Sequence, residues 1–239
     1  MVRFFLLNAF IAVHTILFCL CAIIVSVMDG TGRLSHFYAA VPWAKAILWV
    51  CGVKVSVYGR ENADDSVPRI YMSNHQSYFD IFVLLGYLPV NFKFILKEEL
   101  MRIPLFGSAM RRAGYIAINR DDPRKALRSM NEAAEKIKNG ASVLIFPEGT
   151  RSKDGILQDF KKGGFHLALK SGCDIIPVSI MNTGLIVPKG SLRIQRGRAG
   201  LCIGHPVPTK DYSKKEMGRL MSRVREEMLR QMKKGDANE

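Results

Sequence analysis

Residues 69–88, RIYMSNHQSYFDIFVLLGYL, join an apolar run, a short polar turn and a second apolar stretch. The first run, 69–73, predicts a buried strand, and residues 78–88 have the pattern of a helix. A strand that leads directly into a helix is typical of an α/β fold, in which ligands bind beyond the carboxyl ends of the strands. His75 is therefore expected at that edge of the sheet.

The rest of the chain extends this pattern. From about Lys54, short apolar runs alternate with amphipathic stretches, which predicts an α/β fold with a mostly parallel sheet covered by helices. The candidate strands are 53–58, 69–73, 92–96, 114–119, 142–146, 175–181, 192–196 and 200–203.

Two helices outside this opening stretch have clear sequence signals. One begins at Asp122 as N-cap, with Pro123 in its first turn, and ends at Gly140. Its expected buried face comprises Ala126, Leu127, Met130, Ala133, Ala134 and Ile137. The other, 213–234, is amphipathic, and we expect its apolar stripe to pack on the core, with direct docking to a membrane as the alternative.

The amino-terminal part of the chain is a predicted membrane element. Residues 4–28 are almost wholly apolar and long enough to cross a bilayer, and they end without a cleavage-site pattern. A second stretch, 41–50, is too short to span and suits an interfacial helix, with Trp43 and Trp49 at the headgroups and Lys45 snorkelling. The two stretches could instead form a hairpin that dips into one leaflet. We therefore expect a membrane-associated helical segment, 1–52, and an α/β domain, 53–239.

Composition limits the partners. A formal charge of +14 calls for an anionic partner, namely nucleic acid, an anionic membrane or an anionic substrate. No aromatic-rich basic strand and no basic helix-turn-helix is evident, so no nucleic acid is expected. The five cysteines lack zinc-site spacing and disulfide density, and His75, His166 and His205 lack ligand-like spacing, so no metal is expected.

His75 and Asp80 form a candidate base and its orienting carboxylate. If His75 lies in the turn and Asp80 in the first helical turn, the carboxylate can reach back to the imidazole. Such a contact would fix the tautomer with Nδ1 protonated and leave Nε2 as a general base for a substrate hydroxyl. The alternative is a surface histidine beside an ordinary helix-start residue.

Two further clusters follow predicted strands. In residues 146–152, FPEGTRS, Gly149 permits a tight turn, Arg151 can grip a phosphate, and Thr150 adds a hydroxyl donor. Glu148 could orient Arg151, accept from a substrate hydroxyl, or pair with a nearby lysine. The run 114–120 ends in Arg120, which is expected at the same edge of the sheet. No P-loop pattern is present, so ATP chemistry is unsupported.

Together these blocks resemble the phospholipid/glycerol acyltransferase family, and within it the bacterial 1-acyl-glycerol-3-phosphate acyltransferases. Asn74-His75 with Asp80 matches the His-x-x-x-x-Asp block, 114–120 the arginine block, 146–152 the third block and 176–179 the proline block. Ala117-Ile118-Asn119 departs slightly from the second block. Lys97-Glu98-Glu99-Leu100 and Phe160-Lys161-Lys162-Gly163 also look like runs of this family.

The resemblance implies acyl transfer from acyl-CoA or acyl-carrier protein to the sn-2 hydroxyl of a lysophosphatidate-like acceptor, giving phosphatidic acid. His75 and Asp80 would be catalytic, and the implied substrate-binding residues are Asn74, Lys97, Arg120, Glu148, Gly149, Thr150 and Arg151. No cofactor or acyl-enzyme is implied, and the expected location is the cytoplasmic face of a bacterial inner membrane. The alternatives are another acceptor, such as glycerol-3-phosphate or a lyso-ornithine lipid, and a non-catalytic lipid-binding protein.

Overall fold

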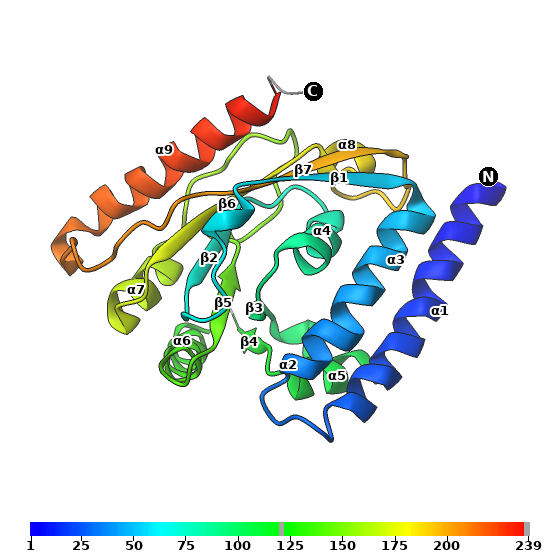
Figure 1. Ribbon diagram of the computed structural model, residues 1–239, viewed down its shortest axis with the longest axis horizontal. Helices are drawn as coiled ribbons and strands as arrows, with labels where there is room; N and C mark the ends of the chain where they lie inside the picture. Colours follow the sequence, from blue (N-terminus) through cyan, green and yellow to red (C-terminus); the bar gives the residue numbers. More distant parts are fainter. Residues whose placement is uncertain (120–121, 237–239) are drawn as a thin grey trace.

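The computed structural model describes residues 1–119 and 122–236. These residues form one seven-stranded sheet with helices around it (Figure 1). The strand order is β1-β7-β6-β2-β5-β3-β4, and every neighbouring pair is parallel except β6 and β7. The predicted α/β class with a mostly parallel sheet is therefore confirmed. The strands are β1 (Val53–Tyr58), β2 (Ile70–Ser73), β3 (Phe92–Lys97), β4 (Ile116–Ile118), β5 (Ser142–Ile145), β6 (Ile175–Met181) and β7 (Gly197–Ile203).

Helices cover both faces of the sheet, which explains why its central strands β2, β5 and β6 are buried at every position and mostly apolar. On β2, Tyr71 joins the core beneath α4 (Phe79–Tyr87), whereas Ile70 and Met72 join the core on the opposite face. That second face carries α6 (Pro123–Lys138), α7 (Lys162–Ser171) and α9 (Met217–Asp236). The alternation of side chains along each strand thus supplies two separate cores.

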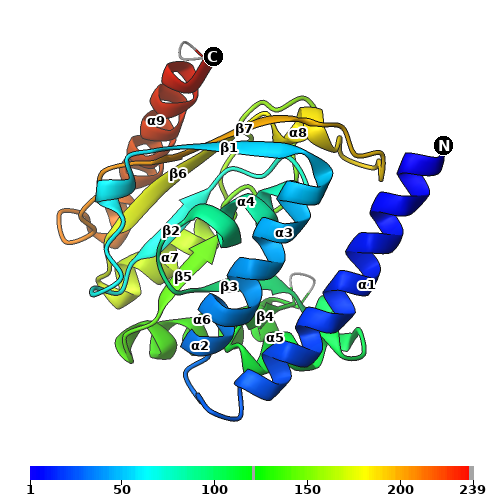
Figure 2. The ribbon, with the colours of Figure 1, turned by 45° about the vertical axis from the view of Figure 1, so that its right-hand side comes forward.

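The amino-terminal helices pack beside the first of these cores. Helix α1 (Val2–Val25) and helix α3 (Val41–Cys51) run side by side in opposite directions (Figures 1 and 2). Between them lie α2 (Arg33–Ser35) and the π-helical turn η1 (His36–Ala40). The short elements of this face are α5 (Phe106–Arg112) and the 3₁₀ turn η3 (Glu98–Arg102).

Helices α1 and α3 differ in burial. At 1.5 Å per residue the 24 residues of α1 extend about 36 Å, enough to cross a bilayer, and half of its apolar side chains are exposed, whereas only Leu7 and Cys19 are buried. Helix α3 instead buries Ala44, Ile47 and Leu48 against the domain, while Trp49 is 80% exposed. Only part of α3 is therefore free to face lipid. The division of the chain at residue 52 stays a prediction.

Helix α9 confirms the expected packing on the core, because Met217, Leu220, Val224 and Met228 are all buried. It follows the 3₁₀ turn η4 (Lys214–Glu216), whose Ser213 and Glu216 form a capping box. Helix α6 begins as predicted, since Asp122 accepts hydrogen bonds from the N–H groups of Arg124 and Lys125. Two minor elements complete the described chain, the 3₁₀ turn η2 (Arg60–Asn62) and α8 (Thr183–Ile186).

Three local predictions were wrong. Residues 192–196 form no strand, and the last strand is one element, β7, that begins at Gly197. Strand β4 spans only Ile116–Ile118 rather than 114–119, because Gly114 has φ +80° and forms a turn. Leu127 is 63% exposed, since the face of α6 that contacts the sheet is centred on Ala133, Ala134 and Ile137.

We expect Gly107→Ala to destabilise the protein, because a Cβ at Gly107 would lie 2.0 Å from the carbonyl oxygen of Met101. The backbone of η3 would have to move, at a cost of about 1–3 kcal/mol typical of overpacking. Gly218→Ala in α9 is the matched control, since nothing lies within 4 Å of its Cβ position. It should stabilise by up to about 1 kcal/mol. Thermal unfolding checks both, and equal melting temperatures would contradict the packing argument.

Candidate active site

His75 and Asp80 meet as the sequence predicts. His75 follows β2 in the turn, and Asp80 lies in the first turn of α4. Nδ1 of His75 is 2.7 Å from Oδ2 of Asp80. A carboxylate at that distance accepts the Nδ1 proton, which assigns the lone pair to Nε2. Phe146 stacks on one face of the imidazole ring, with the two ring centroids 4.0 Å apart, and so supports the ring.

Asp80 is fully buried and surrounded by donors. Its Oδ2 accepts hydrogen bonds from the N–H groups of Gln76 at 2.7 Å and Ser77 at 2.9 Å, besides His75. Its Oδ1 accepts from the hydroxyl of Thr183, at the start of α8. A buried carboxylate needs such donors to offset lost hydration, and they also fix its orientation toward the imidazole.

Glu148 connects the two motif loops. Its Oε1 accepts from the backbone N–H of His75 at 2.7 Å, and its Oε2 accepts from the N–H of Gln158 at 2.8 Å. In return, the N–H of Ser152 donates to the carbonyl of His75 at 2.8 Å. Burial raises the pKa of Glu148 to about 7, against the lowering effect of the two N–H bonds. The carboxyl group thus holds the loop 146–152 against the turn that carries His75.

Asn74, predicted to bind substrate, is buried and fully engaged with β6. Its Nδ2 donates to the carbonyl of Ile180 at 2.9 Å, and its Oδ1 accepts from the N–H of Ile180 at 2.7 Å. These two bonds use the amide as a clamp between β2 and β6. In this structure Asn74 therefore positions the His75 turn rather than facing the open site.

The loop 146–152 presents one cation, Arg151, and the hydroxyl of Thr150, and a second cation, Lys189, contacts it. Gly149 has φ +73°, which a residue with a side chain rarely adopts. The guanidinium of Arg151 lies 3.7 Å from the ring centroid of Tyr78, and its Nη1 is buried with no hydrogen-bond partner among the described residues. Nζ of Lys189 donates to the carbonyl of Arg151 at 2.5 Å and lies 3.4 Å from Oγ1 of Thr150.

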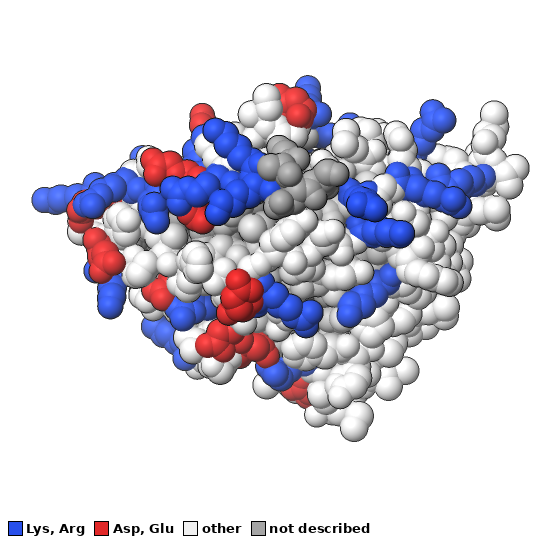
Figure 3. Space-filling model, turned by 45° about the horizontal axis from the view of Figure 1, so that its top comes forward, with Lys and Arg blue, Asp and Glu red and all other residues white. Residues whose placement is uncertain are grey.

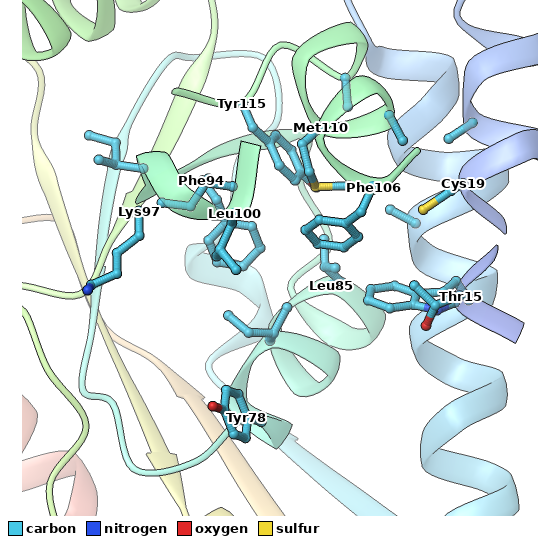
Figure 4. A pocket seen from close by; sticks show the side chains of 18 of the residues that line it. Thr15, Cys19, Tyr78, Leu85, Phe94, Lys97, Leu100, Phe106, Met110 and Tyr115 are labelled. Carbon is cyan, nitrogen blue, oxygen red and sulfur yellow. The ribbon is translucent and has the colours of Figure 1, made fainter. Parts of the chain in front are cut away.

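A cavity of about 560 Å³ begins at this site and extends between the helices. His75, Tyr78, Lys97, Phe146 and the loop residues 149–151 line one part of it. The remainder is mainly apolar and comes from α1, η1, α3, α4 and α5. Figure 4 shows Lys97 and Tyr78 on one side, with Thr15 and Cys19 of α1 on the other. The volume is within the usual range for ligand sites.

A second, mainly apolar hollow of about 530 Å³ adjoins this cavity. Both are lined by Thr15, Cys19, Leu100 and Phe106, so they share a wall between α1 and the segment 100–106. Ile103 and Ile16 on this wall are about half exposed. The apolar interior of the site thus lies close to the apolar outer surface of α1.

The predicted site residues are therefore distributed as follows. Described residues that line the cavity are His75, Lys97, Gly149, Thr150 and Arg151, whereas Asp80, Asn74 and Glu148 lie behind it as buried supports. Arg120 lies outside the described residues. Thr183 and Lys189 were missed, because their links to Asp80 and Arg151 span 103 and 38 residues of sequence. Within the described part of the chain no cluster of three or more His, Cys, Asp or Glu could hold a metal.

The chain has relatives among known proteins. The family described as Acyltransferase matches residues 54–181. A chloroplastic 1-acyl-sn-glycerol-3-phosphate acyltransferase of Arabidopsis thaliana is 41% identical over 185 residues, 77% of this chain and 51% of that protein. The enzyme of the same name from Saccharomyces cerevisiae is 31% identical, covering 89% of this chain and 71% of its own length. The chain thus spans about half the length of the chloroplastic relatives.

A solved structure resembles nearly the whole chain. The crystal structure of the 1-acyl-sn-glycerophosphate acyltransferase PlsC from Thermotoga maritima aligns with a TM-score of 0.84 at 31% identity. The alignment covers 99% of this chain and 97% of that one. It therefore includes the amino-terminal helices as well as the sheet.

Glu148 should make stability depend on pH. Because the folded pKa of about 7 exceeds the ordinary value of 4.5, its contribution to stability is present at low pH and is lost as the pH rises from about 4.5 through 7. In Glu148→Gln this component is absent, so the melting temperature of the wild type should fall relative to that of the variant as pH rises over this window. Glu132→Gln, at an exposed carboxyl on α6, controls for the loss of one acid. Parallel curves for wild type and Glu148→Gln would contradict the prediction.

Proposed function

The chain belongs to the acyltransferase family, and we propose that it acylates the sn-2 hydroxyl of 1-acyl-glycerol-3-phosphate to form phosphatidic acid. The observation that carries this proposal is the joint position of three features: the His75–Asp80 pair, the cations Arg151 and Lys97, and one apolar cavity. Together they suit a substrate with a reactive hydroxyl, an anionic group and an acyl chain. The names of the relatives support the same substrate.

The chemistry follows from the geometry of the histidine. Nε2 takes the proton of the acceptor hydroxyl while that oxygen attacks the thioester carbonyl carbon of the donor. The tetrahedral intermediate then expels the thiolate, which recovers the proton from the imidazolium, so a C–O bond replaces the C–S bond. Asp80 stabilises the transient imidazolium through Nδ1 and holds the ring in place. No enzyme nucleophile is needed, because the acceptor supplies the attacking oxygen.

The anionic group of the acceptor has its partners at the polar end of the cavity. Arg151, Lys97 and Thr150 line this space, and Nη1 of Arg151 has no hydrogen-bond partner among the described atoms. A guanidinium can donate two parallel hydrogen bonds to a phosphate. Binding of this kind orients the hydroxyl of the acceptor relative to His75. By its resemblance to the family pattern, Arg120 is proposed to bind the same phosphate.

The apolar part of the cavity is proposed to hold an acyl chain. Residues Thr15, Phe18, Cys19 and Ala22 of α1 recur every three or four positions and so form one face that closes the cavity. The opposite wall comes from α4 and α5. Moving an acyl chain from water into this apolar space is favourable, and its polar end then lies beside His75.

We propose a membrane location in which α1 and α3 form a hairpin held in one leaflet. Contacts along α1 support this: Arg3 donates to the carbonyl of Ile194, and Trp43 donates to Thr15. A helix attached to the domain along its length cannot cross the bilayer alone. Figure 3 shows a broad uncharged surface on the side where α1 lies in Figure 1, with basic side chains elsewhere on that face. Such charges favour anionic headgroups and either proposed donor, acyl-CoA or acyl-carrier protein.

The first test is transfer itself. Membranes carrying the protein are given acyl-CoA or acyl-carrier-protein thioester with lysophosphatidate, glycerol-3-phosphate or a lyso-ornithine lipid, and both thiol release and acylated product are measured. We expect phosphatidic acid from lysophosphatidate. Turnover of another acceptor alone would replace the proposed substrate, and no turnover with any acceptor would overturn the enzyme assignment.

Asp80→Asn should reduce kcat by about 10³- to 10⁴-fold, because an amide cannot accept from Nδ1 and two backbone N–H groups as the carboxylate does. His75→Ala should abolish transfer to a similar extent while lysophosphatidate still binds. Glu132→Gln is the control for a neutralised acid. Full activity in His75→Ala would favour a non-catalytic lipid-binding protein.

Filling the cavity should shorten the acyl chain that the enzyme uses. Ala22→Leu adds three carbons to a residue that lines the apolar part of the cavity. Ala9→Leu makes the same change at an exposed position of α1 and is the control. Competition among donors and acceptors of different chain length should show a preference shifted toward shorter chains only in Ala22→Leu. An identical length profile in both variants would place the acyl chain elsewhere.

A further inference from the structure

Residues 187–196, here named the strap, connect α8 to β7 and lie outside the residues matched by the family. The strap has no regular structure at 191–196, yet three distant parts of the protein hold it. The hydroxyl of Ser77 donates to the carbonyl of Val187 at 2.7 Å. Asn8 and Arg3 of α1 donate to the carbonyls of Leu192 at 3.2 Å and Ile194 at 2.9 Å. The strap is thus fixed between the histidine turn and α1.

Lys189 is the residue that the strap brings next to Thr150 and Arg151, which line the cavity. Its ammonium contacts the carbonyl of Arg151 and the hydroxyl of Thr150, both neutral groups, and it is half-buried. Among the described residues, none of the ion pairs includes Lys189. An ammonium has three donors, and a buried charge is stabilised most by an opposite charge. The position therefore calls for an anion.

Arg151 gives independent evidence for an anion at the same loop. One nitrogen of its guanidinium, Nη1, is buried without a partner in the described structure, and the group lies over the ring of Tyr78. Lys189 reaches the main chain of that same residue. Two cations, Arg151 on the loop and Lys189 on the strap, meet at this point with unused donors, and they match the two negative charges and three oxygens of a phosphate monoester.

We propose that Lys189 binds the phosphate of the acceptor together with Arg151, an inference that rests on the proposed acyltransferase function. The strap then supplies a substrate-binding cation that the family blocks do not contain. Its ammonium also holds the main chain of Arg151, so the two cations keep a fixed spacing. Because the strap is bonded to α1, the phosphate site is connected to the membrane helix.

The test compares Lys189→Gln and Lys189→Arg with Arg193→Gln, an exposed control on the same strap. Removing one charged hydrogen bond to phosphate should raise KM for lysophosphatidate about tenfold, with kcat changed less than about twofold. Lys189→Arg should restore most of the affinity, and Arg193→Gln should match the wild type. Transfer to 1-acylglycerol, which lacks the phosphate, should not change in Lys189→Gln.

Two outcomes would overturn the proposal. If Lys189→Gln lowers transfer equally for lysophosphatidate and for 1-acylglycerol, the residue only supports the loop, and if it changes neither, the residue has no role. A binding measurement separates this inference from the proposed function. The rise in melting temperature caused by glycerol-3-phosphate should be smaller in Lys189→Gln than in Arg193→Gln. That readout needs no turnover, so it tests Lys189 even where the wild type transfers no acyl group.

Discussion

The rest of the active site depends on one buried carboxylate, that of Asp80. A buried carboxylate loses its hydration. Hydrogen-bond donors of the protein must replace the lost water, or the buried charge destabilises the fold. Four groups supply them: the N–H groups of Gln76 and Ser77, the imidazole of His75 and the hydroxyl of Thr183. Meeting this requirement fixes where the turn after β2 runs and where α8 begins. The orientation of the His75 imidazole thus follows from the hydrogen bonds that stabilise the buried carboxylate of Asp80.

The direction of the strands then decides which residues can gather around that base. Strands β2, β3, β4, β5 and β6 are all parallel to one another through their pairings, so their carboxyl ends share one edge. His75 follows β2, Glu148 follows β5, and Lys97 ends β3. Strand β7 runs the other way beside β6, and its preceding segment therefore returns to the same edge. This reversal is what delivers Lys189 to the loop 146–152.

Local sequence predicted the parts of the structure that local forces determine. The strand–turn–helix unit at 69–88 and the Asp122 cap needed only propensity, apolar pattern and capping chemistry, and the structure agrees with them. The contact between His75 and Asp80 could be inferred because five residues separate them. Family resemblance then indicated which loop would face this pair.

Other features could not be inferred, because they arise from packing between distant segments. The run 192–196 contains apolar residues, but in the fold its carbonyls are bonded to α1 instead of to a strand. Asn74 belongs to a motif, and its hydrogen bonds with the main chain of Ile180, 106 residues away, were not evident from the sequence. Leu127 satisfies a helical pattern, and only the position of the sheet shows that it faces solvent.

The apolar side of α1 has a consequence for handling the protein. One face of this helix closes the cavity, and its other face, with Phe5, Leu6 and Leu17 exposed, needs an apolar surrounding. A detergent monomer has the same two parts as a lysolipid, a single tail and a polar head. Extraction into micelles thus places a competitor at high concentration directly against the helix that borders the cavity proposed to hold the acyl chain. Apparent affinities measured in micelles will include this competition, and comparison with lipid nanodiscs gives its size.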